Sequence, residues 1–239
     1  MPRDAVLSES VRHVAFIPAR GGSKSIPGKN IIELNGSPLI SYSIHAAQNI
    51  SQDCRVVVSS DDTEILSVAS SLGTEILQRP DELSQDNSPT STAIFHMLQS
   101  LALDQDDTET VIILLQPTSP LRNAAQIDEA LALFHSSDAT SVISVYELDI
   151  SPEKSMLEDE AGYLRGICDD DSSFKPRQQL SRAYYPNGAI YIFYASEFLK
   201  VNEIPLDKCL PYVMDRRYSV DIDTTDDLQL AERLMNEIG

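Results

Sequence analysis

The chain has 239 residues, of which 42% are hydrophobic and 23% charged, a composition that can bury a core and excludes a disordered tail. Its 37 acidic residues outnumber 18 basic ones, and the formal net charge of −19 repels a nucleic-acid backbone, so we expect no nucleic-acid partner. The length favours one main globular unit over two equal domains.

The cysteines and the apolar runs of the sequence indicate the cellular compartment of the protein. Cys54, Cys168 and Cys209 are odd in number and too far apart for a C-x-x-C pair, so we expect no disulfide framework and a reducing environment. No apolar run approaches the ~18 residues of a membrane-spanning helix. The N-terminal segment MPRDAVLSESVR has acids where a signal peptide needs an apolar stretch. The sequence therefore predicts a cytoplasmic protein with no membrane partner.

Short β-branched apolar runs alternate with segments of helical spacing, a pattern typical of βαβ units around a parallel sheet. The expected strands are residues 13–18, 55–59, 74–77, 110–116 and 141–146. The expected helices are residues 38–49, 62–72, 90–103 and 123–135, with Asp61 or Asp62 as an N-cap. This predicts an α/β fold with an open, doubly wound, mostly parallel sheet, whose ligands bind beyond the carboxyl ends of the strands.

The pattern changes between residues 147 and 185, where glycines, prolines and acidic clusters replace the periodic runs. We interpret this segment as an insertion of short strands or an arm, which buries little apolar surface alone and so packs against a second subunit. Three elements are expected after it: a strand at 188–194, a short strand at 219–223 and a helix at 225–238. The predicted main domain is therefore residues 1–146 plus 186–239, with the inserted arm at 147–185.

A glycine-rich basic loop, ARGGSKSIPGKN, follows the first expected strand. It holds the cations Arg20, Lys24 and Lys29, and no acid lies in it. Its consecutive glycines allow backbone N–H groups to approach an anion closely, so it is interpreted as a phosphate-binding loop. It matches neither the P-loop nor the G-x-G-x-x-G pattern. The alternative is a solvated glycine-rich turn with incidental cations.

Two aspartates stand near the C-terminal end of the chain. Asp221 and Asp223 flank Ile222 in an expected strand, where the two-residue period puts both carboxylates on one face. Paired carboxylates repel each other unless a cation lies between them, and Mg²⁺ bridging to a substrate phosphate fits such hard oxygen ligands. The alternative is that Asp223 and the polar residues after it cap the terminal helix without any metal.

The polar segment QPTSPLR follows the most apolar expected strand and faces the expected crevice. Gln116 and Arg122 are able to hydrogen-bond a hydroxylated, carboxylated ligand there, the arginine with two N–H groups at once. The alternative is a proline-stiffened turn in which Ser119 or Asn123 caps the next helix.

Five segments in this order resemble the acylneuraminate cytidylyltransferases, also called CMP-sialic acid synthetases, within the Rossmann-like nucleotidyltransferase folds. They are PARGGSKSIPGKN, VSSD, QPTSPLR, PRQQLSRAYYPNGAIY and DIDT. The resemblance implies transfer of CMP from CTP to the anomeric hydroxyl of a nonulosonic acid (N-acetylneuraminate, legionaminate or pseudaminate), with pyrophosphate as the second product. The alternatives are the same transfer to the eight-carbon acid Kdo, against which QPTSPLR and PNGAIY argue, and a non-catalytic nucleotide-binding regulator.

The resemblance also implies residue roles by position. The nucleotide site would consist of Arg20, Gly21, Gly22, Ser23, Lys24, Lys29, Asn30 and Arg79, with Asn30 and Arg79 on the cytidine. The catalytic set would be Arg20, Lys24, Lys29 and Asp221, and the Mg²⁺ ligands would be Asp221 and Asp223. The sugar pocket would use Gln116, Asn187 and Tyr191, together with Lys154 and Arg177 from the dimerisation arm of a partner subunit in a homodimer.

One position departs from the family pattern. Tyr185 stands directly before Pro-Asn-Gly, where some sialic acid enzymes of the family have an arginine. The missing cation bears on how the sugar acid is held, so the three nine-carbon acids remain open.

Overall fold

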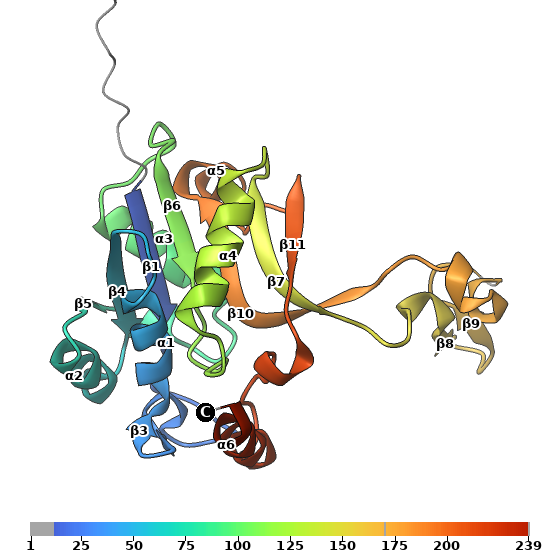
Figure 1. Ribbon diagram of the computed structural model, residues 1–239, viewed down its shortest axis with the longest axis horizontal. Coiled ribbons are helices and arrows are strands. Elements are labelled where there is room, and N and C mark those ends of the chain that lie inside the picture. The colour runs from blue at the N-terminus through green and yellow to red at the C-terminus, as the bar shows by residue number, and fades with distance from the viewer. Residues whose placement is uncertain (1–11, 170, 239) are drawn as a thin grey trace, which may run out of the picture.

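The computed structural model describes residues 12–169 and 171–238 (Figure 1). Within them a seven-stranded sheet forms in the order β11-β7-β10-β6-β1-β4-β5. Its strands are β1 (Arg12–Pro18), β4 (Cys54–Ser60), β5 (Glu75–Gln78), β6 (Thr110–Leu114), β7 (Ser141–Glu147), β10 (Tyr184–Tyr194) and β11 (Cys209–Val213). Strand β10 is antiparallel to both of its neighbours, and the other pairs are parallel. The predicted α/β fold with a mostly parallel sheet is confirmed.

The α-helices are α1 (Leu39–Gln48), α2 (Thr63–Ser71), α3 (Thr90–Ser100), α4 (Ala124–His135), α5 (Ala195–Val201) and α6 (Thr225–Ile238). Short 3-10 helices are η1 (Lys29–Ile31), η2 (Asp81–Leu83), η3 (Pro152–Lys154), η4 (Ser172–Phe174), η5 (Arg177–Gln179) and η6 (Arg216–Tyr218). Asp62 caps α2 by accepting hydrogen bonds from two backbone N–H groups, as predicted. Asn123 caps α4 in a capping box with Gln126.

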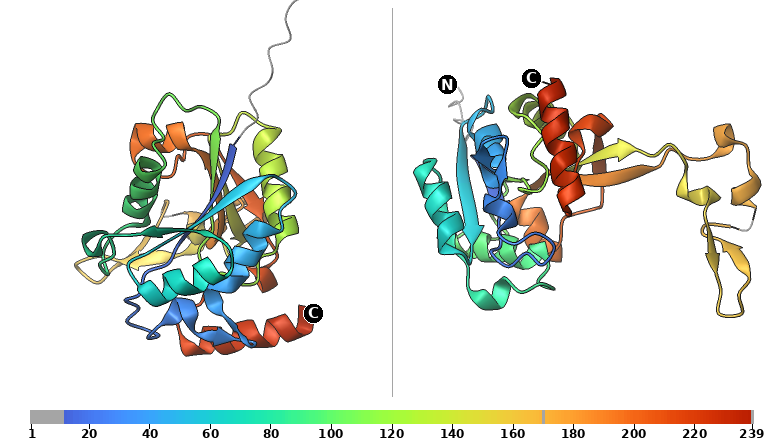
Figure 2. Two further views of the ribbon diagram at one scale, coloured as in Figure 1. Left: turned by 90° about the vertical axis from the view of Figure 1, so that its left-hand side faces the viewer. Right: turned by 90° about the horizontal axis from the view of Figure 1, so that it is seen from below.

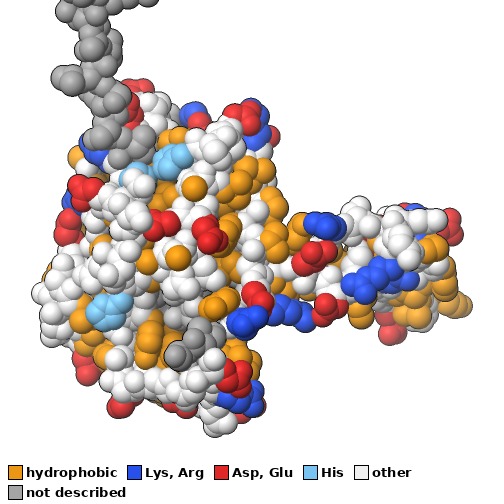
Figure 3. Space-filling model, in the orientation of Figure 1, with side chains coloured by type: hydrophobic (Ala, Val, Ile, Leu, Met, Phe, Trp, Pro, Cys, Tyr) orange, Lys and Arg blue, Asp and Glu red, His pale blue; other side chains and the backbone are white. Residues whose placement is uncertain are grey.

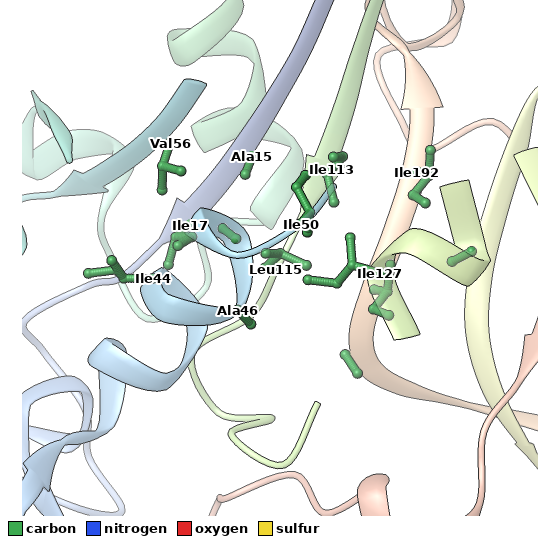
Figure 4. Packing of buried hydrophobic residues seen from close by; sticks show 14 of the residues in the cluster. Ala15, Ile17, Ile44, Ala46, Ile50, Val56, Ile113, Leu115, Ile127 and Ile192 are labelled. Carbon is green, nitrogen blue, oxygen red and sulfur yellow. The ribbon is translucent and has the colours of Figure 1, made fainter. Parts of the chain in front are cut away.

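Helices cover both faces of the sheet because the strand side chains alternate between the faces. Ala15 and Ile17 of β1 pack with residues of α1, α2 and α4, whereas Val14 and Phe16 pack with α3 and α5. Figure 4 shows the first of these layers, and the left view of Figure 2 shows helices on either side of the sheet. This two-sided core makes the carboxyl edge of the parallel strands a rigid platform.

One expectation about the last third of the chain is wrong, and one strand there was not predicted. Residues 219–223 form no strand, although Val220 and Ile222 are buried and Asp221 and Asp223 reach solvent, as the alternating pattern predicted. The segment is held in place by the loop after β6, because the Ile222 N–H donates to the Thr118 carbonyl at 2.8 Å. Strand β11 was missed because it contains Pro211, which is tolerated here because β11 lies at the edge of the sheet.

Residues 148–183 project away from the sheet as an arm (Figures 1 and 2). The arm holds a small antiparallel pair, β8 (Met156–Glu158) with β9 (Leu164–Gly166). Another short pair, β2 (Glu33–Leu34) with β3 (Ser37–Pro38), precedes α1. Figure 3 shows hydrophobic side chains on the surface near the end of the arm. The exposed large apolar residues of the arm are Ile150, Leu157, Tyr163, Leu164, Ile167 and Phe174. The domain division and the role of the arm in dimerisation stay predictions.

The expectations for the N-terminal segment concern mainly residues 1–11, which lie outside the described residues. In the part of the chain that the structure describes, no helix is long and apolar enough to cross a membrane.

Candidate active site

A cleft of about 300 Å³ opens beyond the carboxyl ends of β1, β5 and β6. Loops from distant parts of the sequence form its walls, as expected for this edge of a parallel sheet. The residues around it are Pro18, Arg20, Ser23, Lys29, Asn30, Arg79, Leu83, Ser84, Gln85, Asp86, Ser88, Pro89, Thr90, Gln116, Pro117 and Thr118. The structure therefore brings the predicted phosphate loop, Arg79 and Gln116 together at one site.

Two cations of the glycine-rich loop converge on one carboxylate. Arg20 Nη1 lies 3.2 Å from Asp86 Oδ1, and Lys24 Nζ lies 2.5 Å from Asp86 Oδ2. The hydrogen bond from Lys24, together with the charges of Lys24 and Arg20, lowers the pKa of Asp86. Asp86 stands 66 residues from Arg20 and carries no local sequence signal, so sequence reasoning missed it. In this structure the two cations together hold the carboxylate of Asp86.

The two glycines of the loop occupy different environments. A Cβ on Gly21 would lie 2.7 Å from Asp62 Cβ, whereas a Cβ on Gly22 would meet nothing within 4 Å. The Gly21 N–H donates to Asp61 Oδ1 at 3.1 Å, which ties the loop to the start of α2. Of these two glycines, only Gly21 is required by a close approach within the protein.

Gly21→Ala is expected to lower the free energy of unfolding by about 1–3 kcal/mol, because Asp62 is fixed as an N-cap and the loop has to move. Gly22→Ala is the matched control, with an expected change of less than about 0.5 kcal/mol. Urea unfolding followed by circular dichroism measures both. Equal losses for the two variants would contradict the close-packing role of Gly21.

Arg79 is a buried cation with unpartnered donors. Its exposed fraction is 5%, and its Nε and Nη2 atoms are buried without a hydrogen-bond partner. The nearest carboxylate oxygen, Asp61 Oδ1, lies 4.0 Å from Nη2. Burial lowers the pKa of Arg79; the charge of Asp61 acts in the opposite direction, and the charge of Arg20 lowers the pKa further. Because buried donors in proteins are nearly always satisfied, this side chain is suited to a ligand in the cleft that it lines.

Asn30 lines the same cleft as Arg79 and is also buried. Its Nδ2 donates to the Arg20 carbonyl at 2.8 Å, which fixes the backbone of the phosphate loop. Ser23 lines the same wall. Five of the predicted nucleotide-site residues thus line one cleft: Arg20, Ser23, Lys29, Asn30 and Arg79. Their contact with a nucleotide stays a prediction.

Lys29 joins the glycine-rich loop to the aspartate pair. Its Nζ donates to the Ile222 carbonyl at 2.9 Å and to Asp223 Oδ1 at 2.9 Å. The protein around Asp221 displaces part of its water, and this desolvation, with the charge of Asp223, raises the pKa of the Asp221 carboxyl. A hydrogen bond from Thr118 and the charge of Lys29 act in the opposite direction. The carboxylate pair thus lies next to the cationic cleft.

Helix capping does not use the carboxylate of Asp223. The cap of α6 is formed by Thr224 and Asp227, since Asp227 Oδ2 accepts from the Thr224 N–H at 2.8 Å and Asp227 N–H donates to Thr224 Oγ1 at 3.3 Å. The Asp223 carboxylate instead pairs with the Lys29 ammonium group.

The oxygen donors of the aspartate pair fit Mg²⁺. Mg²⁺ is typically held by one or two carboxylates together with substrate phosphates and water. Among the described residues, no group of three or more His, Cys, Asp or Glu side chains is placed to hold a metal ion. Asp221 and Asp223 therefore match a shared site that a phosphate completes, and the partly desolvated Asp221 carboxylate favours a nearby cation.

The loop after β6 is fixed from inside by Arg122. This buried guanidinium donates from Nη2 to the Gln116 carbonyl at 2.7 Å and to Ser43 Oγ at 2.6 Å, and from Nη1 to the Ser119 carbonyl. Burial lowers the pKa of Arg122 to about 9, so it stays charged at neutral pH. Within the structure Arg122 therefore holds the loop, while its Nε is buried without a partner, and Asn123 caps α4 as in the alternative interpretation. Ligand binding by Arg122 stays a prediction.

Arg122→Met is expected to lower the free energy of unfolding by about 3 kcal/mol, because the Gln116 and Ser119 carbonyls lose a buried donor. Guanidinium chloride unfolding at pH 7 measures the loss. The exposed Arg182 provides a control, since Arg182→Met removes the same charge from the surface of the arm. A loss of under 1 kcal/mol in Arg122→Met would contradict this role.

The predicted sugar residues lie around the same loop. Ser119 Oγ donates to the Asn187 carbonyl at 3.2 Å, and a Cβ on Gly188 would lie 2.8 Å from Gln116 Oε1. The amide of Asn187 is engaged within the protein, accepting from Ser144 Oγ at 2.6 Å and donating to Ser219 Oγ at 2.9 Å.

Tyr191 is also close to this site. Burial raises the pKa of Tyr191, and the charge of Asp221 raises it further, which places the two side chains within electrostatic reach. Tyr191 therefore belongs to the region around Asp221.

A second cavity of about 400 Å³ adjoins the aspartate pair. Asp221 and Asn187 line it, and so does Tyr185, whose ring packs on Tyr146 with a centroid distance of 5.6 Å. Sequence reasoning did not single out another lining residue, Arg216 of η6.

Lys154 and Arg177 lie on the arm, in η3 and η5. Within one chain the structure does not bring them to the cleft, because the arm projects away from the sheet (Figure 1). Their predicted contribution to a sugar pocket requires a second subunit.

Comparison with known proteins places the chain in a family. The cytidylyltransferase family model matches residues 14–236. The chain is 32% identical over 219 residues to N-acylneuraminate cytidylyltransferase of Streptococcus agalactiae serotype V, covering 91% of this chain but only 52% of that protein. It thus spans about half the length of that relative. It is also 32% identical to pseudaminic acid cytidylyltransferase of Campylobacter jejuni, covering 94% of this chain and 96% of that protein.

A CMP-N,N'-diacetyllegionaminic acid synthase of Legionella pneumophila is 32% identical over 94% of this chain and 97% of its own length. Among solved structures, CMP:2-keto-3-deoxy-manno-octonic acid synthetase complexed with CTP superposes with a TM-score of 0.69 at 17% identity, covering 95% of this chain and 100% of that one. At this identity the likeness shows the fold alone. The family match and the relatives together confirm the resemblance: the chain belongs to the cytidylyltransferase family.

Proposed function

We propose that this chain is an enzyme that transfers CMP from CTP to the anomeric hydroxyl of a nonulosonic acid and releases pyrophosphate. The observation that carries the proposal is a cationic cleft, with unpartnered buried donors on Arg79, directly beside the Asp221 and Asp223 pair. The names of relatives that act on N-acylneuraminate, pseudaminic acid and legionaminic acid support the same chemistry.

The glycine-rich loop binds the triphosphate in this proposal. Arg20 and Lys24 exchange Asp86 for phosphate oxygens, and Lys29 approaches the same charge from the aspartate pair. Fixed cations of this kind stabilise the negative charge that builds up on the departing pyrophosphate. Arg79 and Asn30 hold the cytidine end, where the free N–H groups of Arg79 find acceptors.

The aspartate pair holds Mg²⁺ in this proposal. When bound, the ion neutralises phosphate charge and lowers the pKa of the attacking hydroxyl. Asp221 and Asp223 supply the carboxylates, and Thr118 orients Asp221 through its hydrogen bond. Arg122 keeps Thr118 in place by holding the loop on both sides of it.

The remaining contribution to catalysis in this proposal comes mainly from positioning of the two substrates. An anomeric hydroxyl placed in line with the α-phosphorus attacks it while the bond to the bridging oxygen of pyrophosphate breaks, and the protein forms no covalent intermediate. Gln116, Asn187 and Tyr191 surround the place where the acid would lie. Kdo remains the alternative acceptor within the same chemistry.

We further infer a homodimer built through the arm. The exposed apolar side chains of the arm are suited to burial against a second copy, and Lys154 and Arg177 would then reach the partner's sugar pocket. A cytoplasmic location fits the free cysteines Cys54, Cys168 and Cys209.

Pyrophosphate release from CTP and Mg²⁺ tests the function directly. N-acetylneuraminate, legionaminate, pseudaminate and Kdo are offered separately, each with an EDTA control. Release that depends on Mg²⁺ and on one nine-carbon acid is the expected result. Release with Kdo alone would favour the alternative acceptor, and CTP binding by calorimetry without any release would favour a regulator.

A further inference from the structure

The cavity of about 400 Å³ beside Asp221 has charges of both signs in its wall. Asp221 and Asp227 contribute carboxylates, and Arg216 contributes a guanidinium. The other lining residues are uncharged: Tyr146, Tyr185, Pro186, Asn187, Ser219, Val220 and Leu230. Arg216 is therefore the cation that an anionic group in this cavity would meet among the described residues.

Two contacts hold the guanidinium of Arg216: an aromatic ring lies against its flat face, and one terminal nitrogen donates a hydrogen bond. Its Cζ lies 5.0 Å from the centroid of the Tyr146 ring, so the aromatic ring supports the cation. Its Nη1 donates to Asp149 Oδ2 at 2.7 Å. The side chain remains 58% exposed. A guanidinium has five N–H donors, so these contacts leave donors for a planar carboxylate.

We propose that Arg216 is a specificity-determining residue that binds the carboxylate of the acceptor sugar acid in this cavity. The inference rests on the proposed function, because the acceptor must bring its hydroxyl to the aspartate pair. The carboxylate of such an acid is repelled by Asp221 and Asp227 unless a cation takes it up. Arg216 supplies this cation in the same cavity wall as Tyr185.

Asp149 competes with the substrate for the same guanidinium. It lies at the start of the arm, directly after β7, and its carboxylate is 75% exposed. The acid of the substrate therefore replaces an exposed, well-hydrated partner, an exchange that costs little. Removing the charge of Asp149 is expected to strengthen binding of the acid.

The neighbouring Arg217 gives a matched control. Both arginines belong to η6, their side chains are 58% and 57% exposed, and each pairs with an aspartate. Each also lies over a tyrosine ring, at 5.0 Å for Arg216 and 5.9 Å for Arg217. Only Arg216 lines the cavity. Loss of charge, of an ion pair or of a ring contact therefore affects both variants alike.

Steady-state kinetics of Arg216→Met and Arg217→Met, with the nine-carbon acid that the wild type accepts, test the proposal. Arg216→Met is expected to raise KM for the acid at least tenfold and to leave KM for CTP within twofold. Arg217→Met is expected to leave both within twofold. Arg216→Lys should recover part of the loss, and Asp149→Asn should lower KM for the acid two- to fivefold.

The 1-carboxamide of the same acid distinguishes carboxylate binding by Arg216 from a purely structural role, because a structural defect would affect turnover of the acid and of the amide equally. The wild type is expected to prefer the acid over the amide in kcat/KM by tenfold or more, and Arg216→Met to lose this preference. An unchanged preference in Arg216→Met, with an active wild type, would overturn the role of Arg216 and leave the proposed function standing. A wild type that turns over none of the acids would overturn both.

Discussion

Asp221→Asn is expected to lower kcat for pyrophosphate release by about a hundredfold or more, because the variant loses a carboxylate that would hold Mg²⁺ at the reacting phosphate. CTP affinity should change less than threefold, since Arg20, Lys24 and Arg79 are untouched. Stopped-time assays at saturating CTP and Mg²⁺, with calorimetry for CTP, measure the two quantities separately.

The stability of this variant separates a catalytic from a structural effect. Desolvation raises the pKa of Asp221, so at neutral pH the folded state carries a charge that it disfavours relative to the unfolded state. That cost is present above the raised pKa and disappears as the pH falls below the unfolded-state value. The uncharged asparagine is therefore expected to leave Tm at pH 7 unchanged or higher.

Asp226→Asn is the matched control for Asp221→Asn. It removes the same charge from the first turn of α6, five positions further along, on an exposed side chain. Its kcat should stay within twofold of the wild type. Normal turnover in Asp221→Asn would remove the metal-binding role from this carboxylate.

Arg79→Met is expected to weaken CTP binding about a hundredfold. The buried Nε and Nη2 groups of Arg79 have no partner in the protein, so a ligand that satisfies them gains charge-assisted hydrogen bonds in a site with little water. The fold should tolerate the change, because an apolar side chain of similar length replaces a buried cation whose one carboxylate partner among the described residues, Asp61, lies 4.0 Å away. Calorimetry with CTP and a thermal melt measure the two effects.

Arg55→Met is the control for this variant. Arg55 belongs to the neighbouring strand β4, is exposed, and donates two hydrogen bonds to Glu75, at 2.9 and 2.7 Å. CTP binding should be unaltered there. If both variants bound CTP as the wild type does, Arg79 would have no role in the nucleotide site.

Local pattern predicted most of the fold. The alternating apolar residues of the parallel strands and the caps at Asp62 and Asn123 are properties of short segments, and the structure confirms them. Residues 219–223 show the limit of such patterns. Alternating burial there arises from packing against the loop after β6 and not from pairing with another strand, a difference that the sequence of the segment does not contain.

The site was predictable only in part, for a related reason. The resemblance named Arg20, Lys29 and Asp223 one by one, but the contact between Lys29 and Asp223 joins side chains 194 positions apart. Asp86 and Arg216 were missed because their importance depends on which loops meet, not on their neighbours in sequence. The orientation of a long side chain is likewise set by the surrounding fold. The Arg122 side chain points into the protein because three oxygen acceptors lie there, the Gln116 and Ser119 carbonyls and Ser43 Oγ.

The exposed arm affects the order in which parts of the chain unfold. In the described part of the chain, β8 and β9 pair only with each other, whereas the strands of the central sheet belong to one seven-stranded sheet whose two faces are packed against helices. Opening the arm therefore breaks few buried contacts, and its local unfolding costs far less free energy than that of the sheet. An isolated subunit should exchange its amide hydrogens first, and be cut first by a protease, between β8 and β9.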